Sequence, residues 1–420
     1  MTGVSDAGIR KEGINKMRDM YYDVVIAGCG VAGLYTALRL GRDKKILMLS
    51  KEDLESCDSM LAQGGICVLH DENDYDSYFE DTMRAGHYEN RKESVDLMIR
   101  GSRAIIDDLL SLGVRFAKNP DGTLAYTREG AHSRPRICFH EDITGKEITT
   151  TLLSHVKKLT NVTIMEYTVM TDILVVNDHC CGMIAKTKDG ETLHIHAQDT
   201  VMATGGIGGL YEHSTNFPIL TGDACRIAEQ HGVELEHMDY VQIHPTCLYS
   251  KKPGRSFLIS ESARGEGAIL LNHKGERFVN ELLPRDVVTK AIHEEMEKEG
   301  VDHEFISFEN VPEEIIKGHF PHIYEKCLEE GYDILKEPAP IVPAQHYFMG
   351  GVHVDRDSET TMPHLYAVGE TSCNGVHGKN RLASNSLLES LVFAKRAAQK
   401  IELTQKGKEE HESNYHAACC

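Results

Sequence analysis

Hydrophobic and polar positions near the start of the chain follow the order strand, turn, helix, strand. Residues 23–27 (DVVIA) predict a short buried strand, residues 32–40 have the apolar spacing of a helix, and residues 46–49 (ILML) predict a second strand. This order within about 30 residues predicts the start of a doubly wound parallel sheet. Residues 1–20 are polar without periodicity, and we expect a loose N-terminal arm there.

Further along, three stretches carry apolar residues at helical spacing, which predicts amphipathic helices that pack into a core. They are residues 75–82, 95–109 and 148–159. Strand patterns follow near residue 163 and at residues 173–176, 193–197, 200–203 and 365–368. We expect a helix from Ser386 and a polar tail over residues 402–420, which lack an apolar stripe.

The amino-acid composition changes between residues 241 and 350. Pro, His, Arg and Gly are frequent there, between short predicted helices at residues 287–297 and 312–316. We interpret this segment as an inserted α+β domain. It would divide a larger α/β domain into residues 21–240 and 351–401.

The composition narrows the classes of function. The 45 Lys and Arg stand against 65 Asp and Glu, a net charge of −20, which argues against a nucleic-acid partner because phosphates call for a basic surface. No run approaches the ~18 apolar residues of a membrane span, and the first apolar run is broken by glycines, unlike a secretory signal. The twelve cysteines include no C-x-x-C pair, so we expect no metal or iron–sulfur ligation and a reduced, cytoplasmic chain.

The turn between the first strand and the first helix carries a candidate dinucleotide site. It reads Gly28-Cys29-Gly30-Val31-Ala32-Gly33, a G-x-G-x-x-G. The first glycine permits the tight turn, the second lets the backbone approach a pyrophosphate, and the third lets helix pack on strand. The N-terminus of the helix would face the phosphates.

The residues after the second strand bear on which dinucleotide binds, NADP or FAD. At the end of the second strand, Ser50 stands where a ribose-binding acid is expected, and Lys51 could suit a 2′-phosphate, so NADP rivals FAD. Two later segments favour FAD. Residues 203–206 (ATGG) let the backbone pass close to a bulky cofactor, and residues 365–370 end in Glu370, which could accept hydroxyl hydrogens of a ribityl chain.

These patterns resemble the FAD-binding domain of the glutathione-reductase-like flavoproteins. That resemblance implies a Rossmann-like α/β fold, in which residues 241–350 form an α+β capping domain for the substrate. Residues 58–65 (DSMLAQGG) are similar to the segment that wraps the isoalloxazine ring in the succinate dehydrogenase/fumarate reductase flavoprotein family. Respiratory members carry a His where this chain has Asp58, which implies non-covalent, dissociable FAD.

Further blocks of that family follow in order along residues 22–401. They are residues 242–246 (QIHPT), 260–267 (SESARGEG), 283–287 (LPRDV), 343–351 (PAQHYFMGG) and 380–389 (NRLASNSLLE). Residues 127–133 (TREGAHS) are similar to the L-aspartate oxidase branch of the family. Members of that branch usually carry a C-terminal helical domain, which we expect this chain to lack.

The resemblance implies a role for each candidate site residue. His244, His346, Arg381 and Ser260 would hold carboxylates, a task that suits the planar fork of arginine. Ser260 stands where Thr is common, His244 precedes a proline and His346 is expected in a Pro/Gly-rich loop, so neither histidine is an apolar-face residue. Arg285 would transfer a proton with the help of Glu261 and Arg264, because arginine alone is always protonated. Glu129 would meet the ammonium group of an amino acid. The residues expected to contact FAD are Gly28, Cys29, Gly30, Val31, Ala32, Gly33, Ser50, Lys51, Asp58, Ser59, Ala62, Gln63, Gly64, Gly65, Thr204, Gly205, Asp223, Glu370, Ser386 and Leu387.

The implied activity is FAD-dependent oxidation of L-aspartate to iminoaspartate, the first step of de novo NAD synthesis. Fumarate or O₂ would accept the electrons, and quinolinate synthase would act downstream. Two alternatives stay open. One is a soluble fumarate reductase or succinate-oxidising flavoprotein. The other is a non-catalytic FAD-binding scaffold, although a scaffold has no need for two arginines and two histidines in the expected carboxylate positions.

Overall fold

The computed structural model describes residues 17–252 and 254–418, with side chains up to Gln405 in the last helix. A seven-stranded sheet lies at its centre, in the order β5-β2-β1-β8-β7-β6, with β16 beside β8. The pairs β5-β2, β2-β1, β1-β8 and β8-β16 are parallel, and β6, β7 and β8 form an antiparallel meander. The bounds are β1 (Met17–Ala27), β2 (Ile46–Leu49), β5 (Val162–Met165), β6 (Thr168–Val176), β7 (His179–Thr187), β8 (Thr192–Met202) and β16 (Leu365–Ala367).

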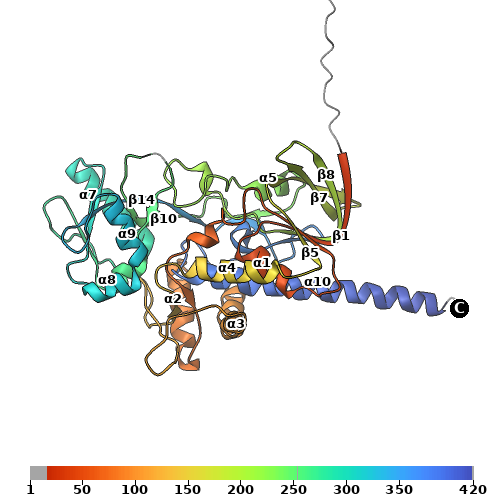
Figure 1. The fold of residues 1–420 in the computed structure, drawn as a ribbon, viewed down its shortest axis with the longest axis horizontal. Coiled ribbons are helices and arrows are strands. Elements are labelled where there is room, and N and C mark those ends of the chain that lie inside the picture. The colour runs from red at the N-terminus through yellow and green to blue at the C-terminus, as the bar shows by residue number, and fades with distance from the viewer. Residues whose placement is uncertain (1–16, 253, 419–420) are drawn as a thin grey trace, which may run out of the picture.

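Both faces of this sheet are buried. Successive residues of β1 point to opposite faces, so each face contributes apolar side chains to a separate core. Val24 and Ile26 belong to a core shared with α1, α3, α4 and α10, whereas Val25 and Ala27 pack with the meander and α5. In Figure 1, α1, α4 and the long α10 lie along the lower side of the sheet, with α2 and α3 below them, and α10 reaches the sheet itself because Gln405 bonds Asp199 of β8. The bounds are α1 (Val31–Arg39), α2 (Tyr75–Ala85), α3 (Lys92–Ser111), α4 (Thr144–Val156), α5 (Asp223–Gln230) and α10 (Asn385–Ala418).

A second sheet is built wholly from residues 241–350, the segment whose composition differs. Its five strands follow the order β11-β10-β14-β13-β12, and every pair is antiparallel. This part has its own hydrophobic core and lies at the end of the molecule opposite β7 and β8 (Figure 1). Its elements are β10 (Val241–Leu248), β11 (Phe257–Leu258), α6 (Glu261–Gly265), β12 (Ile269–Leu271), α7 (Arg285–Glu299), β13 (Glu304–Ser307), α8 (Glu313–His319), α9 (Pro321–Glu329) and β14 (Ala339–Phe348).

Smaller elements complete the chain. A two-stranded sheet joins β3 to β4, and a three-stranded sheet follows the order β17-β15-β9. These strands and the short 3-10 helices are β3 (Ile66–Cys67), β4 (Ile137–Cys138), β9 (Leu235–Glu236), β15 (Gly351–His353), β17 (Ser372–Cys373), η1 (Asp58–Leu61), η2 (Glu72–Asp74), η3 (Gly208–Leu210) and η4 (Gly369–Thr371). No helix in the described part of the chain is long and apolar enough to cross a membrane.

The two chain ends correct the sequence analysis. Residues 17–20 are not a loose arm, because β1 begins at Met17 and pairs with β8 from Thr192 onward. Such a ladder is held by backbone hydrogen bonds and needs no apolar pattern. Residues 1–16 of the predicted arm lie outside the described residues.

The predicted tail is also wrong at its start, because α10 continues through residues 402–405. Ile401 and Gln405 are buried, the Glu402 carboxylate accepts a hydrogen bond from the Gly41 N–H (2.8 Å), and the Gln405 amide donates to Asp199 (2.7 Å). The strands predicted at 193–197 and 200–203 are one strand, β8, and His346 lies in β14 rather than in a loop.

Candidate active site

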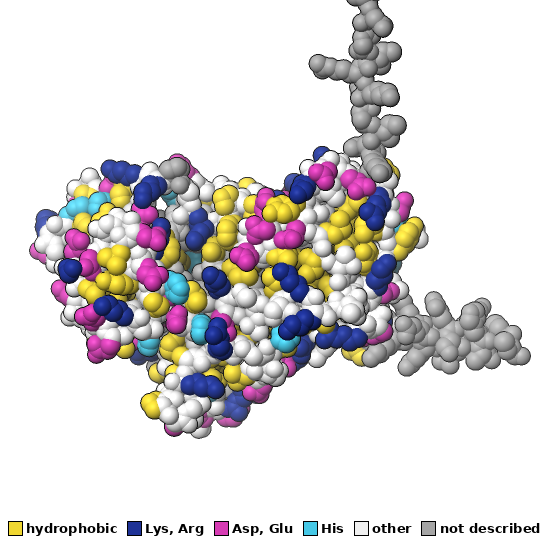
Figure 2. Space-filling view, in the orientation of Figure 1, with side chains coloured by type: hydrophobic (Ala, Val, Ile, Leu, Met, Phe, Trp, Pro, Cys, Tyr) yellow, Lys and Arg dark blue, Asp and Glu magenta, His cyan; other side chains and the backbone are white. Residues whose placement is uncertain are grey.

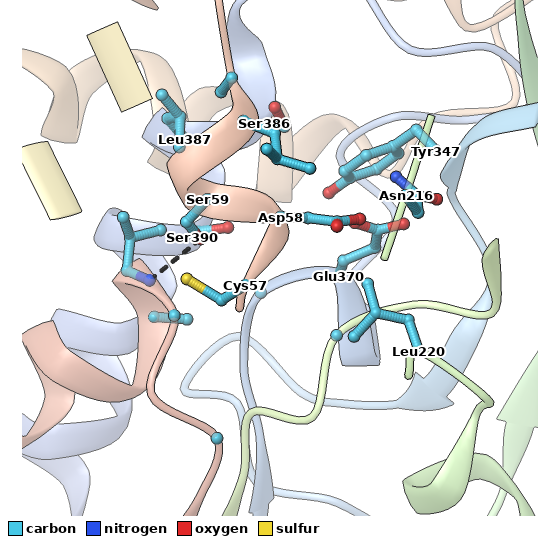
Figure 3. A pocket seen from close by; sticks show the side chains of 18 of the residues that line it. Cys57, Asp58, Ser59, Asn216, Leu220, Tyr347, Glu370, Ser386, Leu387 and Ser390 are labelled. Carbon is cyan, nitrogen blue, oxygen red and sulfur yellow. Dashed lines mark hydrogen bonds between the residues drawn. The ribbon is translucent and has the colours of Figure 1, made fainter. Parts of the chain in front are cut away.

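The turn between β1 and α1 is as tight as its glycines predict. Gly28 has φ +117°, and a Cβ there would lie 1.9 Å from the Ala203 carbonyl oxygen. A Cβ on Gly33 would lie 2.1 Å from the Gly28 oxygen, so this glycine serves helix packing. At Gly30 the nearest atom to such a Cβ is the Ser59 hydroxyl oxygen at 3.0 Å, and that hydroxyl accepts a hydrogen bond from the Val31 N–H (3.1 Å, dashed in Figure 3). The N-terminus of α1 therefore opens toward Ser59 and the adjoining cleft.

One cleft collects nearly all predicted cofactor residues, which lie in α1, η1, α5, η4 and α10 and in the segments that follow β1, β2, η1 and β8. Gly33 is the one that does not line it. The lining residues among those predicted are Gly28, Cys29, Gly30, Val31, Ala32, Ser50, Lys51, Asp58, Ser59, Ala62, Gln63, Gly64, Gly65, Thr204, Gly205, Asp223, Glu370, Ser386 and Leu387. Ser386 and Leu387 are in the first turn of α10, so a second helix N-terminus with its free N–H groups meets the same cleft.

Lys51, which follows the second strand, pairs with an acid at the start of α5. The Lys51 ammonium donates to the Ile219 carbonyl oxygen (2.9 Å), the Thr221 hydroxyl (2.9 Å) and the Asp223 carboxylate (2.8 Å). With Asp223 as its ion-pair partner, Lys51 is not free to serve a 2′-phosphate. This arrangement removes the main argument for NADP and places a carboxylate beside Lys51 in the lining of the cleft.

Two carboxyl groups face each other elsewhere in the cleft. Figure 3 shows the side chains of Asp58 and Glu370 pointing toward one another. Asp58 accepts a hydrogen bond from the Phe217 N–H (2.9 Å) and Glu370 accepts one from the Phe348 N–H (2.9 Å). Burial raises the pKa of Asp58 to about 7, and burial together with the Asp58 charge raises the pKa of Glu370 to about 8. Both groups therefore hold a proton more firmly than exposed carboxyls do.

The predicted proton-transfer residues form a continuous chain. Arg285, at the start of α7, donates to the Glu261 carboxylate through Nε and to the Gln242 side-chain oxygen through Nη1 (2.9 Å). Glu261 is also 3.5 Å from Arg264, whose Nη1 donates to the Glu281 carbonyl oxygen (2.5 Å). Burial acts to raise the pKa of Glu261, but the charges of Arg285 and Arg264 outweigh it, so the pKa is lowered and Glu261 is ionised.

Glu129 lines the same end of the cleft and is 2% exposed. Its carboxylate accepts hydrogen bonds from the hydroxyls of Ser262 (2.8 Å) and Ser384. Burial, and then the neighbouring Glu261, raise the pKa of Glu129. A cation that entered beside Glu129 would favour its ionised form.

His346 and Arg381 line this end of the cleft, and His244 is buried beside His346. His244 and His346 lie edge to face, with ring centroids 5.2 Å apart, and burial lowers the pKa of both well below the usual value, so both are neutral. The His244 Nδ1 accepts a hydrogen bond from the Thr246 N–H (3.2 Å), which leaves a proton on Nε2, a buried donor without a partner among the described residues. The Arg381 guanidinium lies 4.5 Å from the Tyr347 ring centre, its Nη1 donates to the Ser386 hydroxyl (3.1 Å), and its Nε is likewise buried without a partner. These free donors suit a carboxylate.

The structure brings together most, but not all, of the predicted substrate and catalytic residues. Glu129, Ser260, Glu261, Arg285, His346 and Arg381 line the cleft. His244 and Arg264 are fully buried behind it, and Ser260 accepts a hydrogen bond from the Ser262 N–H (3.2 Å), which begins α6.

The sequence analysis missed four residues that shape this site. Gln242 bonds both Arg285 and the Arg381 carbonyl oxygen (2.9 Å), and Ser262 and Ser384 hold Glu129. These three lie inside the family-like blocks, so the signal was present. Arg255 lines the cleft and donates to the Thr215 carbonyl oxygen (3.1 Å), but its neighbourhood (KKPGRS) reads as an exposed turn and gave no signal.

Comparisons with known proteins identify the family. A family described as "FAD binding domain" matches residues 23–387. L-Aspartate oxidase of Clostridium perfringens is 51% identical over 380 residues, which are 90% of this chain and 86% of that protein. The chain belongs to the L-aspartate oxidase family. Another L-aspartate oxidase, from Clostridium acetobutylicum, is 47% identical over 93% of this chain and 90% of its own length.

A solved structure supports the mixed α/β flavoprotein fold of this L-aspartate oxidase family member. The FrdA chain of Escherichia coli quinol fumarate reductase superposes with a TM-score of 0.86 at 32% identity, over 92% of this chain and 70% of that chain. The cofactor of the family is FAD. The cleft fits FAD, since it combines a glycine turn without room for a Cβ, two helix N-termini and the paired Lys51 and Asp223.

Proposed function

We propose that this chain oxidises L-aspartate to iminoaspartate with non-covalently bound FAD, as the first step of NAD synthesis. The observation that carries the proposal is Glu129, a buried carboxylate that lines the same cleft as Arg285 and Arg381. A dicarboxylate with one ammonium group matches this set, because Arg285 and Arg381 suit its two carboxylates and Glu129 suits its ammonium group. When bound, FAD supplies the acceptor for the two electrons and the hydrogen that leave Cα.

The two substrate carboxylates would be held by His244, His346, Arg381 and Ser260. The histidines are neutral and act as hydrogen-bond donors, so the positive charge comes from Arg381 and Arg285. A bidentate contact to Arg381 also fixes the orientation of the substrate. These groups contact carboxylates alone, and they treat aspartate, succinate and fumarate alike.

Glu129 would bind the substrate ammonium. The oxidation releases protons, and Arg285 would pass one from the substrate to Glu261 through its Nε–H, with Arg264 stabilising the carboxylate behind it. Gln242 orients Arg285 for this transfer by accepting from Nη1. The N-terminus of α10 would stabilise negative charge that develops in the cleft.

We assign residues 21–240 and 351–401 to a FAD-binding domain of the glutathione-reductase type, and residues 241–350 to a capping domain. The separate core and the separate five-stranded sheet of the second segment support this division. The cap would contribute His244, Ser260, Glu261, Arg285 and His346, whereas Glu129 and Arg381 come from the other domain.

The electrons would pass from the flavin to O₂ or fumarate. Imines hydrolyse in water, so an enzyme that consumes iminoaspartate must act at once, and quinolinate synthase in the cytoplasm would be that partner.

The decisive experiment compares two activities of the Glu129→Gln holoenzyme. Without oxygen, L-aspartate should bleach the wild-type flavin, and the variant should do so at least ~10²-fold more slowly, because a buried charge without its partner costs several kcal/mol. Reoxidation of the chemically reduced flavin by fumarate should be nearly unchanged, since fumarate carries no ammonium. Glu309→Gln, an exposed acid elsewhere, is the matched control.

A parallel loss of both activities in Glu129→Gln would assign Glu129 a structural role and remove the chemical support for aspartate. Bleaching of the wild type by succinate but not by aspartate would instead support a succinate-oxidising or fumarate-reducing enzyme.

A further inference from the structure

A second cavity lies on the other side of Glu129. Its volume is about 240 Å³, and it lies between residues 128–133 and the loop that precedes α7. The Ala131 N–H joins the two walls by a hydrogen bond to the Leu282 carbonyl oxygen (3.0 Å). The residues that line it are Arg84, Arg128, Glu129, Ala131, His132, Ser133, Leu282, Leu283 and Pro284. We refer to this cavity as the vestibule.

Glu129 is the residue that lines both the vestibule and the FAD cleft. Pro284, at the other wall, directly precedes Arg285 in the chain. The vestibule therefore adjoins the substrate end of the cleft, and one carboxylate side chain separates the two spaces.

The charge of the vestibule is set by Arg128. Its side chain is exposed, and no hydrogen bond or ion pair engages its guanidinium within residues 17–252 and 254–418. Arg84, by contrast, is paired with Asp81 and donates to the Ala131 carbonyl oxygen (3.0 Å). Burial lowers the pKa of His132 to about 4, so it is neutral. Arg128 is thus the one cation of this lining whose charge is not compensated by an acid.

An uncompensated cation at this place has a physical consequence. The chain carries a net charge of −20, which repels anions over most of its surroundings. Figure 2 shows acidic and basic side chains interspersed over one face, without a broad basic area that could offset this repulsion there. A cation above a cavity with apolar walls, here Leu282 and Leu283 (each 38% exposed), concentrates the local field and raises the rate at which anions arrive.

We propose that the vestibule is the access site for the dicarboxylate substrate, where Arg128 binds one carboxylate before the ligand passes Glu129 into the cleft. The proposal rests on the proposed function for the identity of the ligand. Passage requires the Glu129 side chain to turn away from Ser262 and Ser384, which hold it across the opening. Arg128 acts on arrival, whereas the residues of the cleft act on the bound substrate.

The test measures association separately from chemistry in the Arg128→Gln, Arg128→Glu and Arg128→Lys holoenzymes. Succinate is mixed rapidly with the oxidised enzyme and its binding is followed by the change in flavin absorbance. Turnover with L-aspartate is measured in parallel, at about 10 mM and about 150 mM ionic strength. Arg42→Gln removes another exposed arginine without an ion pair in the described structure and is the matched control.

We expect the succinate association rate and kcat/KM for aspartate to fall about 5-fold in Arg128→Gln at low salt, and further in Arg128→Glu. Succinate, with two negative charges, should be affected more than aspartate, with a net charge of −1. The loss should shrink at high salt, Arg128→Lys should restore most of the rate, and kcat should not change.

A fourth variant tests the route itself. Leu282→Trp places bulk at the mouth without changing charge, and it should slow succinate association at both salt concentrations. Unchanged association in both Arg128→Glu and Leu282→Trp would overturn the proposal. A fall of kcat in parallel with kcat/KM in Arg128→Gln would overturn it too, because Arg128 would then act on the chemical step. If the wild type does not oxidise aspartate while succinate association still depends on Arg128, the proposed function is wrong, but the role of the vestibule as an access site for dicarboxylates is supported.

Discussion

Replacement of Asp58 by Asn should stabilise the apoprotein at high pH and leave it unchanged at low pH. Asp58 accepts from the Phe217 N–H through Oδ1, and its Oδ2 is buried without a partner in the described structure. The groups that act on the pair of facing carboxyls are Arg255 on Asp58, and Arg381 and Glu389 on Glu370. An Asn at this position keeps the acceptor for Phe217 and removes the ionisable proton.

The direction of this pH dependence of stability follows from proton linkage. The pKa of Asp58 rises from 3.8 in the unfolded chain to about 7 in the folded protein, so the folded state binds the proton more tightly. The stabilisation is complete below pH ~4 and is lost as the pH rises toward ~7. Roughly three pH units at about 1.4 kcal/mol each give an upper bound of about 4 kcal/mol. Glu370 adds a loss that extends to pH ~8, and its pKa should fall in Asp58→Asn because the neighbouring charge is gone.

Chemical denaturation of apoprotein from pH 5 to pH 9, followed by circular dichroism, measures this difference. Asp58→Asn should gain up to about 4 kcal/mol over the wild type at pH 8 to 9, and less than half of that, about 1.6 kcal/mol, at pH 5, which lies only about one unit above the unfolded pKa. FAD titration by fluorescence should show the same trend, since the FAD phosphates are repelled by ionised carboxyls. Asp189→Asn, in an exposed turn, controls for the loss of one negative charge. The reasoning is refuted if the gain is the same at pH 5 and pH 9.

Three further results are expected. Acid precipitation should release FAD into the supernatant, because Asp58 offers no imidazole for a covalent bond, and a coloured pellet would contradict this. Arg285→Leu should reduce flavin at least ~10²-fold more slowly in stopped-flow experiments while its oxidised spectrum stays intact, since removal of one partner of a buried ion pair costs about 3–5 kcal/mol. Lys51→Met should weaken FAD binding about 10- to 100-fold by fluorescence titration, through the loss of three hydrogen bonds and of the charge that balances Asp223; no change would show that this end of the cleft does not contact the cofactor.

Local signals in the sequence predicted local structure well. The glycine turn, β2, α3 and the start of α10 follow from periodicity and spacing over a few residues. The errors arose where pairing over long distances decides the structure. Residues 17–20 join β8 through backbone hydrogen bonds, and residues 402–405 stay helical because Gln405 reaches Asp199. Neither contact leaves a pattern in the segment itself.

The site shows the same division. Family-like blocks indicated residues that the structure places in or beside one cleft, but spacing could not show that Lys51 would pair with Asp223 at the start of α5. His346 was expected in a loop because prolines and glycines surround it, yet it lies in β14, where pairing with β10 brings it beside His244. A histidine on a central strand is held more rigidly than one on a loop, which suits a carboxylate clamp.

Under the proposed function, the choice between aspartate and succinate depends on the ionisation of Glu129. Glu129 is held by Ser262 from the segment 241–350 and by Ser384 from the turn before α10, so its orientation depends on three segments at once. Burial and the nearby Glu261 raise its pKa, so the ionised form of Glu129 is less favoured in the empty site than it would be in water. An ammonium group bound beside Glu129 would favour its ionised form and offset this cost. Succinate offers no such compensation. Both ligands can make the same carboxylate contacts, and the enzyme would separate them by a charge that aspartate alone can balance.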